Sequence, residues 1–163
     1  MSLKSFIKGW IGETVGAVAQ KLLLDPEIYV SLNNITLQTS NGTTQIDHII
    51  VSPYGVFVVE TKNLRGWIFG GERDESWTQK VFKHTNRFQN PLRQNYKHTR
   101  TLAELLELPP EKIKSVIVFV GNSEFKTAMP ENVTYTGGYI RYIKQHRQEI
   151  IGRDQIEQIL AKL

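Results

Sequence analysis

The segment that most constrains the fold is residues 45–62, in which two apolar, β-branched runs flank the sequence Ser-Pro-Tyr-Gly. Proline at the second position and glycine at the fourth are typical of a β-turn. The two runs therefore predict an antiparallel hairpin in which Ser52 pairs with Gly55. In a regular hairpin this register also pairs Gln45 with Lys62, and Gln45 could then either orient that lysine or end the strand as a solvated amide.

The same register brings two carboxylates together. Asp47 faces Glu60 on one side of the sheet, with Cβ atoms about 4.5–5.5 Å apart. Like charges this close destabilise an apolar sheet unless one carboxylate keeps a proton, Lys62 pairs with them, or a divalent cation binds between them. Two carboxylates beside an ammonium suit Mg²⁺-assisted phosphodiester hydrolysis, with the lysine orienting or helping to deprotonate the attacking water. A structural salt bridge between Lys62 and one acid fits the pattern equally well.

The rest of the chain predicts a mixed α/β or α+β domain with a central sheet. Asn90 followed by Pro91 is typical of a helix start, and this helix should end near Glu107. The apolar run at residues 115–120 is typical of a strand buried on both faces. Other strands are expected over residues 29–38, 66–69, 76–82 and 133–136, and other helices over residues 5–24, near 139–148 and from 154.

Composition narrows the class of protein. A chain of 163 residues that is 40% hydrophobic has enough apolar side chain for one domain, expected over residues 1–163. The absence of cysteine excludes disulfide frameworks, cysteine zinc sites and thiol catalysis. The first 24 residues are amphipathic and contain Glu13, unlike a signal peptide, and no run approaches the roughly 20 apolar residues of a membrane helix. We therefore expect a cytoplasmic protein.

Positive charge is concentrated in one segment. The chain has a net charge of +4, and no acidic residue lies between Glu75 and Glu104. This stretch is either a solvated face or a surface for a phosphate backbone. Its basic residues are Lys80, Lys83, Arg87, Arg93, Lys97 and Arg100, together with His84 and His98.

Four sequence blocks resemble one known family. They are Gly12-Glu13, IDHIIV at residues 46–51, GVFVVETKN at 55–63 and NPLRQ at 90–94. Asp47 followed by Glu60-Thr61-Lys62 resembles the D…ExK pattern of the PD-(D/E)xK nuclease superfamily. The four blocks in this order resemble the nuclease-related domain, NERD, over about residues 9–121. The resemblance implies a restriction-endonuclease-like core, with a central mixed sheet flanked by helices and C-terminal helices over residues 137–163.

The resemblance also implies roles for individual residues. Asp47, Glu60 and the main-chain carbonyl of Thr61 would bind Mg²⁺, for which Mn²⁺ could substitute, and Lys62 would be the catalytic lysine. Glu13 would be the acid of the first helix, which binds metal directly or through water. Gln94 would help to hold the phosphate or the nucleophile.

The remaining candidates have more ordinary interpretations. His48 points to the face opposite Asp47 and is expected to be a packed, hydrogen-bonded histidine. Trp67 and Trp77 are expected to pack in or under the sheet, with base stacking as the alternative.

The leading hypothesis is a metal-dependent deoxyribonuclease, for which a homodimer is possible. It would bind the DNA backbone through the six Lys and Arg residues named above. The alternative is a non-catalytic nucleic-acid-binding or interaction domain that keeps the nuclease fold.

Overall fold

The structure is a computed structural model that describes residues 24–163. The helix expected over residues 5–24, with Glu13 on it, therefore lies outside the described residues except for Leu24. In the described part, the fold is α+β and contains a mixed five-stranded sheet in the order β1-β2-β3-β7-β9. The bounds of these strands are Val30–Thr39, Gly42–Ser52, Gly55–Asn63, Ile113–Val120 and Val133–Tyr135.

Strand β3 lies at the centre of this sheet between two kinds of neighbour. It is antiparallel to β2 through the Ser52–Gly55 turn, and it is parallel to β7 from the Val56·Ile113 pair onward. A parallel partner requires a long connection, which here contains three of the four strands of a second sheet and a long helix. All but the last three residues of β3 are buried, as expected for a strand with partners on both sides.

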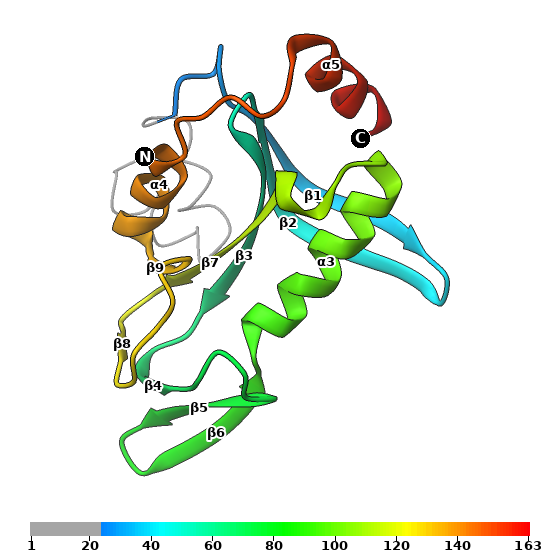
Figure 1. Ribbon diagram of the computed structural model, residues 1–163. Helices are drawn as coiled ribbons and strands as arrows, with labels where there is room; N and C mark the ends of the chain where they lie inside the picture. The colour runs from blue at the N-terminus through cyan, green and yellow to red at the C-terminus, as the bar shows by residue number, and fades with distance from the viewer. Residues whose placement is uncertain (1–23) are drawn as a thin grey trace, which may run out of the picture.

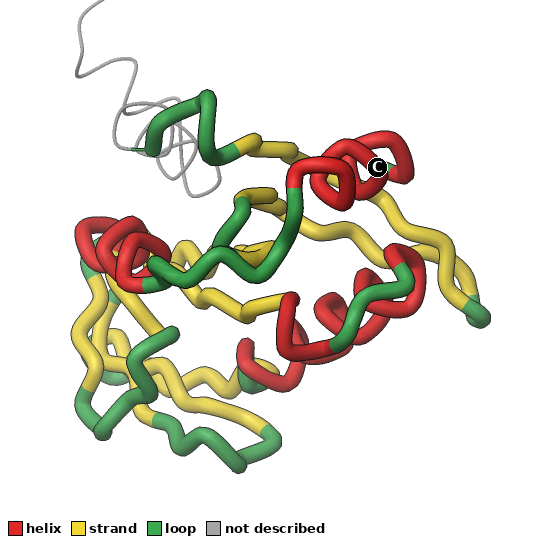
Figure 2. The backbone as a smooth tube through the Cα atoms, turned by 45° about the horizontal axis from the view of Figure 1, so that its top comes forward, coloured by secondary structure: helices red, strands yellow, loops and turns green. Residues whose placement is uncertain are grey.

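Helices cover both faces of the large sheet, as Figures 1 and 2 show. Helices α3 and α5 contribute Leu102 and Ile159 to one apolar cluster, together with Val56 and Val58 of β3. Helix α4 contributes Ile143 to the cluster on the opposite face. The bounds of these helices are Pro91–Leu106 for α3, Thr136–Gln145 for α4 and Arg153–Lys162 for α5. None of the described helices has the length and apolarity to cross a membrane.

A second, four-stranded sheet is attached to the end of β3, and its strand order is β6-β5-β4-β8. Trp77 is fully buried between this sheet and the large one, stacked on Phe119 and edge-on to Phe88. Its indole N–H donates to the carbonyl of Gly71 at 2.9 Å. The expected packing of Trp77 is therefore confirmed. The bounds of the strands are Gly66–Phe69 for β4, Ser76–Val81 for β5, His84–Gln89 for β6 and Ser123–Phe125 for β8; β6 and β8 are absent from the sequence prediction.

Candidate active site

The predicted hairpin is confirmed up to the pair formed by His48 and Val59. The ladder runs from Ser52·Gly55 to His48·Val59 in the expected register. The Ser52 hydroxyl donates to the carbonyl of Gly55 at 3.0 Å and accepts the N–H of Tyr54 at 3.2 Å, so the turn is fixed by its own side chain. His48 is 2% exposed and its Nδ1 lies 2.7 Å from Asn33 Oδ1, as expected for a packed histidine.

The prediction that Asp47 and Glu60 form a regular cross-strand pair is wrong, because the β2–β3 ladder ends one position earlier. The backbone N–H of Thr61 donates instead to Asp47 Oδ2 at 3.1 Å. A carboxylate thus replaces a backbone carbonyl as the acceptor at the point where the strands separate. The expected pairing of Gln45 with Lys62 is also wrong, because it lies beyond the end of the β2–β3 ladder. Gln45 is exposed and pairs with Thr36 of β1 on the other side of β2.

The separation coincides with an irregularity between β1 and β2. The β1–β2 ladder passes from Asn33·His48 to Ile35·Ile46 and omits the position where Asn34 faces Asp47. Asn34 has a φ of +54°, outside the range of regular strands. Asp47 therefore lies in a local break in both of its ladders. Breaks of this kind re-aim side chains and are common beside active sites.

Glu60 and Lys62 lie on the face of β3 that is covered by α3. The Glu60 side chain is 6% exposed and the Lys62 side chain 20% exposed, and Nζ of Lys62 lies 2.9 Å from Oε1 of Glu60. The Lys62 ammonium also donates to Oε1 of Gln94 at 2.7 Å. The lysine is thus held between one carboxylate and one amide, which fixes its position at the edge of solvent.

Helix α3 carries Gln94 to the site because its first turn is anchored. The side chain of Asn90 accepts the N–H of Leu92 at 2.9 Å, while its amide donates to the carbonyls of Glu72 and Asp74 at 3.0 and 2.7 Å. One turn later, the amide of Asn95 donates to the carbonyl of Val58 at 2.9 Å. These contacts join the helix to the small sheet and to β3.

His98 is a site residue that the sequence reasoning placed only within the basic segment. It lies one turn after Gln94, on the same face of α3, and its Nδ1 lies 3.7 Å from Oε2 of Glu60. Burial is the main cause that lowers the pKa of His98 below its usual 6.5, opposed by the negative charge of Asp47 and reinforced by the positive charge of Lys62. His98 is consequently neutral at pH 7. The four-residue spacing from Gln94 was the available signal for it.

The donor groups at this site fit a divalent cation. Asp47 and Glu60 carry two negative charges. Lys62 supplies one positive charge, and neutral His98 supplies none, so the sum is negative. Surplus negative charge on hard oxygen donors is the chemistry that Mg²⁺ requires. Within residues 24–163 no three His, Cys, Asp or Glu side chains form a metal-binding group. The third acid that the family resemblance implies, Glu13, lies outside those residues.

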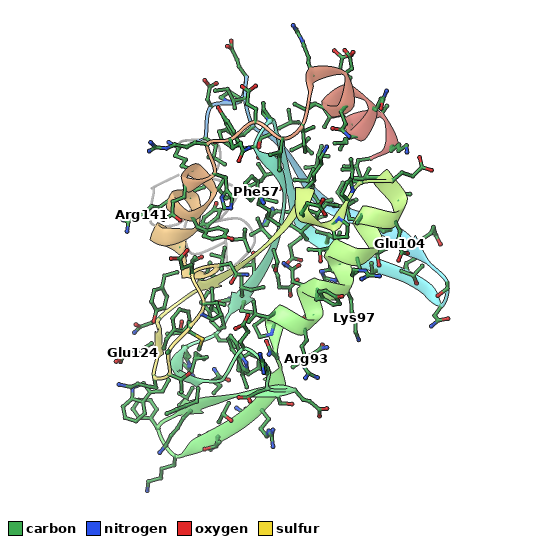
Figure 3. All side chains as sticks on the ribbon, in the orientation of Figure 1. Phe57, Arg93, Lys97, Glu104, Glu124 and Arg141 are labelled. Carbon is green, nitrogen blue, oxygen red and sulfur yellow. The ribbon has the colours of Figure 1, made fainter. Side chains whose placement is uncertain are left out.

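The predicted nucleic-acid-binding residues fall into two exposed groups. Arg93 and Lys97 project from the exposed side of α3, where Glu104 follows them (Figure 3). Arg93 donates to the carbonyl of Arg73 at 2.9 Å, so it also anchors a loop of the small sheet. The group on α3 is Arg93, Lys97 and Arg100, and the group on the small sheet is Lys80, Lys83 and Arg87.

The packing predicted for the two tryptophans is confirmed for Trp77 and wrong for Trp67. Trp67 is 46% exposed, in contrast to the fully buried Trp77. Trp67 lies on β4, where the alternation of strand side chains directs its neighbour Ile68 inward and the indole outward.

Comparisons with known proteins agree with the geometry. The nuclease-related domain family matches residues 8–120, which is close to the extent expected from the sequence blocks. An uncharacterized protein of Bacillus anthracis is 45% identical over 108 residues, a segment that covers 64% of this chain and 51% of that relative. The chain thus spans about half the length of the relative that it matches. No solved structure matches the chain. Because the match covers the hairpin, the Glu60–Lys62 pair and the helix that holds Gln94, the chain belongs to the nuclease-related domain family.

Proposed function

We propose that this protein is a metal-dependent nuclease that hydrolyses phosphodiester bonds of DNA at the site formed by β2, β3 and α3. The observation that carries the proposal is the contact of Lys62 with both Glu60 and Gln94, beside a second carboxylate on Asp47. A lysine held in this way is positioned to orient a water molecule or to take part in proton transfer.

The residues have separate tasks in this proposal. Asp47, Glu60 and the carbonyl of Thr61 would hold Mg²⁺ or Mn²⁺, with Glu13 as an additional acid. When bound, the ion would polarise the phosphate and lower the pKa of a water molecule. The Lys62 ammonium would orient the attacking water, whose proton the bound ion makes easier to lose, and Gln94 is the positioning residue that fixes the ammonium.

A groove beside the site supports nucleic acid as the substrate. It has a volume of about 530 Å³ and lies between the β1–β2 hairpin and α3. Lys97 and Arg100 line it on the helix side together with one acid, Glu104, and Thr39, Thr43 and Thr44 line it on the hairpin side. Cations and hydroxyls are the usual partners of phosphate oxygens, and they hold a backbone without reading its sequence.

The test is cleavage of plasmid and single-stranded DNA in Mg²⁺ or Mn²⁺. Glu60→Gln and Lys62→Met each remove one charge at the site. We expect both to lower the cleavage rate by at least about a hundredfold, the lower range for loss of a general acid or base. Glu111→Gln and Lys144→Met make the same chemical changes on η1 (Pro110–Lys112) and α4, and they should cleave like the wild type.

Two results would contradict the proposal. If both site variants cleave as fast as the wild type, the activity belongs to another protein or to another site. If the wild type binds DNA but does not cleave it in either metal ion, the protein is a non-catalytic nucleic-acid-binding domain.

A further inference from the structure

An open hollow lies on the small sheet, just after the strand that carries Lys62. Its volume is about 630 Å³, and no carboxylate is among the described residues that line it. Strand β3 ends at Asn63, and the first lining residue is Arg65, three positions after Lys62. The lining residues are Arg65, Gly66, Trp67, Lys80, Val81, Phe82 and Asn122.

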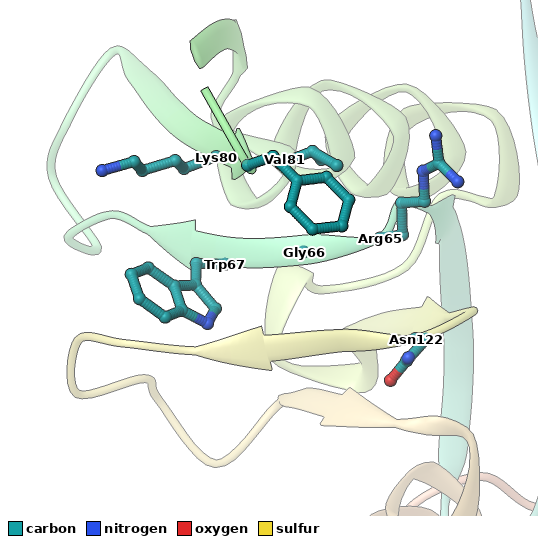
Figure 4. Close-up of a pocket in the computed structure, with 7 residues that line it drawn as sticks. Arg65, Gly66, Trp67, Lys80, Val81 and Asn122 are labelled. Carbon is teal, nitrogen blue, oxygen red and sulfur yellow. The ribbon is translucent and has the colours of Figure 1, made fainter. Parts of the chain in front are cut away.

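Trp67 presents an aromatic surface among cations. Lys80 is its cross-strand partner on β5, and the ammonium lies 5.9 Å from the centre of the indole. Lys126 lies 4.6 Å from the same ring and is also paired with Glu124. Figure 4 shows the indole of Trp67 and the side chain of Lys80 extending toward the same side, with Arg65 at the other end of the hollow.

Phe82 presents a second aromatic surface at the tip of the β5–β6 hairpin. Val81 pairs with His84, so Phe82 is the first residue of a two-residue turn. Its φ is +53°, a conformation in which such turns usually carry glycine. The ring is 93% exposed, so it contributes almost nothing to packing. The strained backbone of Phe82 is not offset by packing of its exposed ring, which indicates that the ring has a partner.

We propose that Trp67 and Phe82 form a stacking platform for unpaired bases of a single-stranded nucleic acid. Two aromatic rings that share a hollow with Arg65 and Lys80 match the two parts of such a strand, because bases stack on the rings while the two cations attract the phosphates. The acid next to Trp67 in the sheet, Glu124, is paired with Lys126. A duplex does not fit this platform, because its bases are already stacked on one another. The choice of nucleic acid as the partner rests on the proposed function, and the platform deepens it by selecting unpaired strands.

The experiment measures binding without cleavage, in a chelator. Two oligonucleotides of equal length are compared by fluorescence anisotropy: one carries thymine bases, and the other has abasic sugars, so their charges are equal. We expect the wild type to bind the thymine strand at least about fivefold more tightly, a difference within the range for stacking of one base. Trp67→Leu and Phe82→Leu, which keep apolar area but remove the ring, should lose this preference. Leu105→Ala, an exposed apolar change on α3, should keep it. Thermal unfolding shows that each variant is folded.

The outcomes separate this proposal from the proposed function. Equal affinity of the wild type for both strands, or an unchanged preference in both leucine variants, overturns the platform even if the protein cleaves DNA. A base preference that depends on the two rings in a protein that never cleaves upholds the platform and overturns the nuclease. Binding to vesicles of anionic lipid without binding to either strand overturns the platform in favour of a membrane surface.

Discussion

Lys62 and Glu60 form an ion pair whose contribution to the stability of the protein can be considered apart from its role at the site. The Glu60 side chain is almost buried, and the pair lies only 2.9 Å apart. Desolvation of two buried charges offsets most of their attraction, so a pair of this kind is weak evidence for stability. Stability therefore does not explain the presence of the pair, and its role at the site does. The second contact of Lys62, to Gln94, is consistent with this interpretation because it orients the ammonium.

Burial of neutral His98 makes the stability of the metal-free protein depend on pH. Its pKa is lowered in the folded state, so the unfolded chain binds a proton more readily. The contribution of His98 is complete above pH 6.5, its ordinary pKa, and is lost as the pH falls toward its lowered value. We expect the free energy of unfolding in a chelator to decrease with acidification below pH 6.5, and His98→Gln to reduce that slope.

Chemical denaturation at a series of pH values measures this slope. His84→Gln, on exposed strand β6, is the matched control and should behave like the wild type. Identical pH profiles for His98→Gln and the wild type would contradict the assignment of a neutral, buried imidazole.

Asn90 connects helix α3 to the small sheet, and both elements depend on it. Its side chain caps the helix at the N–H of Leu92 and binds carbonyls in the loop before β5. Asn90 is fully buried, and removal of its amide would take away the partner of both carbonyls. Gln94 lies one turn further along and takes its position from the same anchor.

Asn90→Ala should therefore destabilise the protein and lower the rate of cleavage together. Loss of a helix cap costs about 1 kcal/mol, and loss of the two hydrogen bonds to the carbonyls costs about 0.5–1.5 kcal/mol each. We expect a decrease of about 2–4 kcal/mol in the free energy of unfolding, measured by urea denaturation. Asn86→Ala, on exposed β6, should change stability by less than about 0.5 kcal/mol. A decrease of that small size in Asn90→Ala would show that the cap is dispensable.

Local chemistry explains which elements were predictable from sequence. The hairpin was predicted in its correct register because the Ser52–Gly55 turn and the apolar runs are local signals. Helix α3 was predicted from Asn90 and Pro91 for the same reason. Strand β6 was missed because its sequence, HTNRFQ, is polar and almost fully exposed, and only its pairing with β5 makes it a strand.

The candidate site was predicted only in part. The sequence blocks identified Asp47, Glu60, Lys62 and Gln94, and the structure places the last three in direct contact. The break at Asp47 was not predictable, because it depends on both neighbouring strands losing their register at one position. His98 was missed because its importance comes from β3, which is distant in sequence.

At the scale of the whole molecule, exposed cations lie on two elements, α3 and the small sheet. Contacts to phosphate release bound counterions, so the number of contacts is read from the salt dependence of affinity. Lys97→Ala combined with Arg100→Ala should make the slope of log affinity against log salt shallower by about 2 for duplex DNA. Arg141→Ala combined with Lys144→Ala removes the same charge from α4 and is the control. Equal slopes for both double variants would place the DNA elsewhere.

The position of β3 between β2 and β7 also affects how the protein is made. On a ribosome, β2 emerges before β3, but β7 follows only after β4, β5, β6 and α3 have been synthesised. Until then the Val56–Asn63 edge of β3 lacks its parallel neighbour, and Glu60 is not yet paired with Ile117. A half-made chain therefore has the carboxylates and the lysine without the sheet that holds them rigid. The candidate site is thus completed late in synthesis.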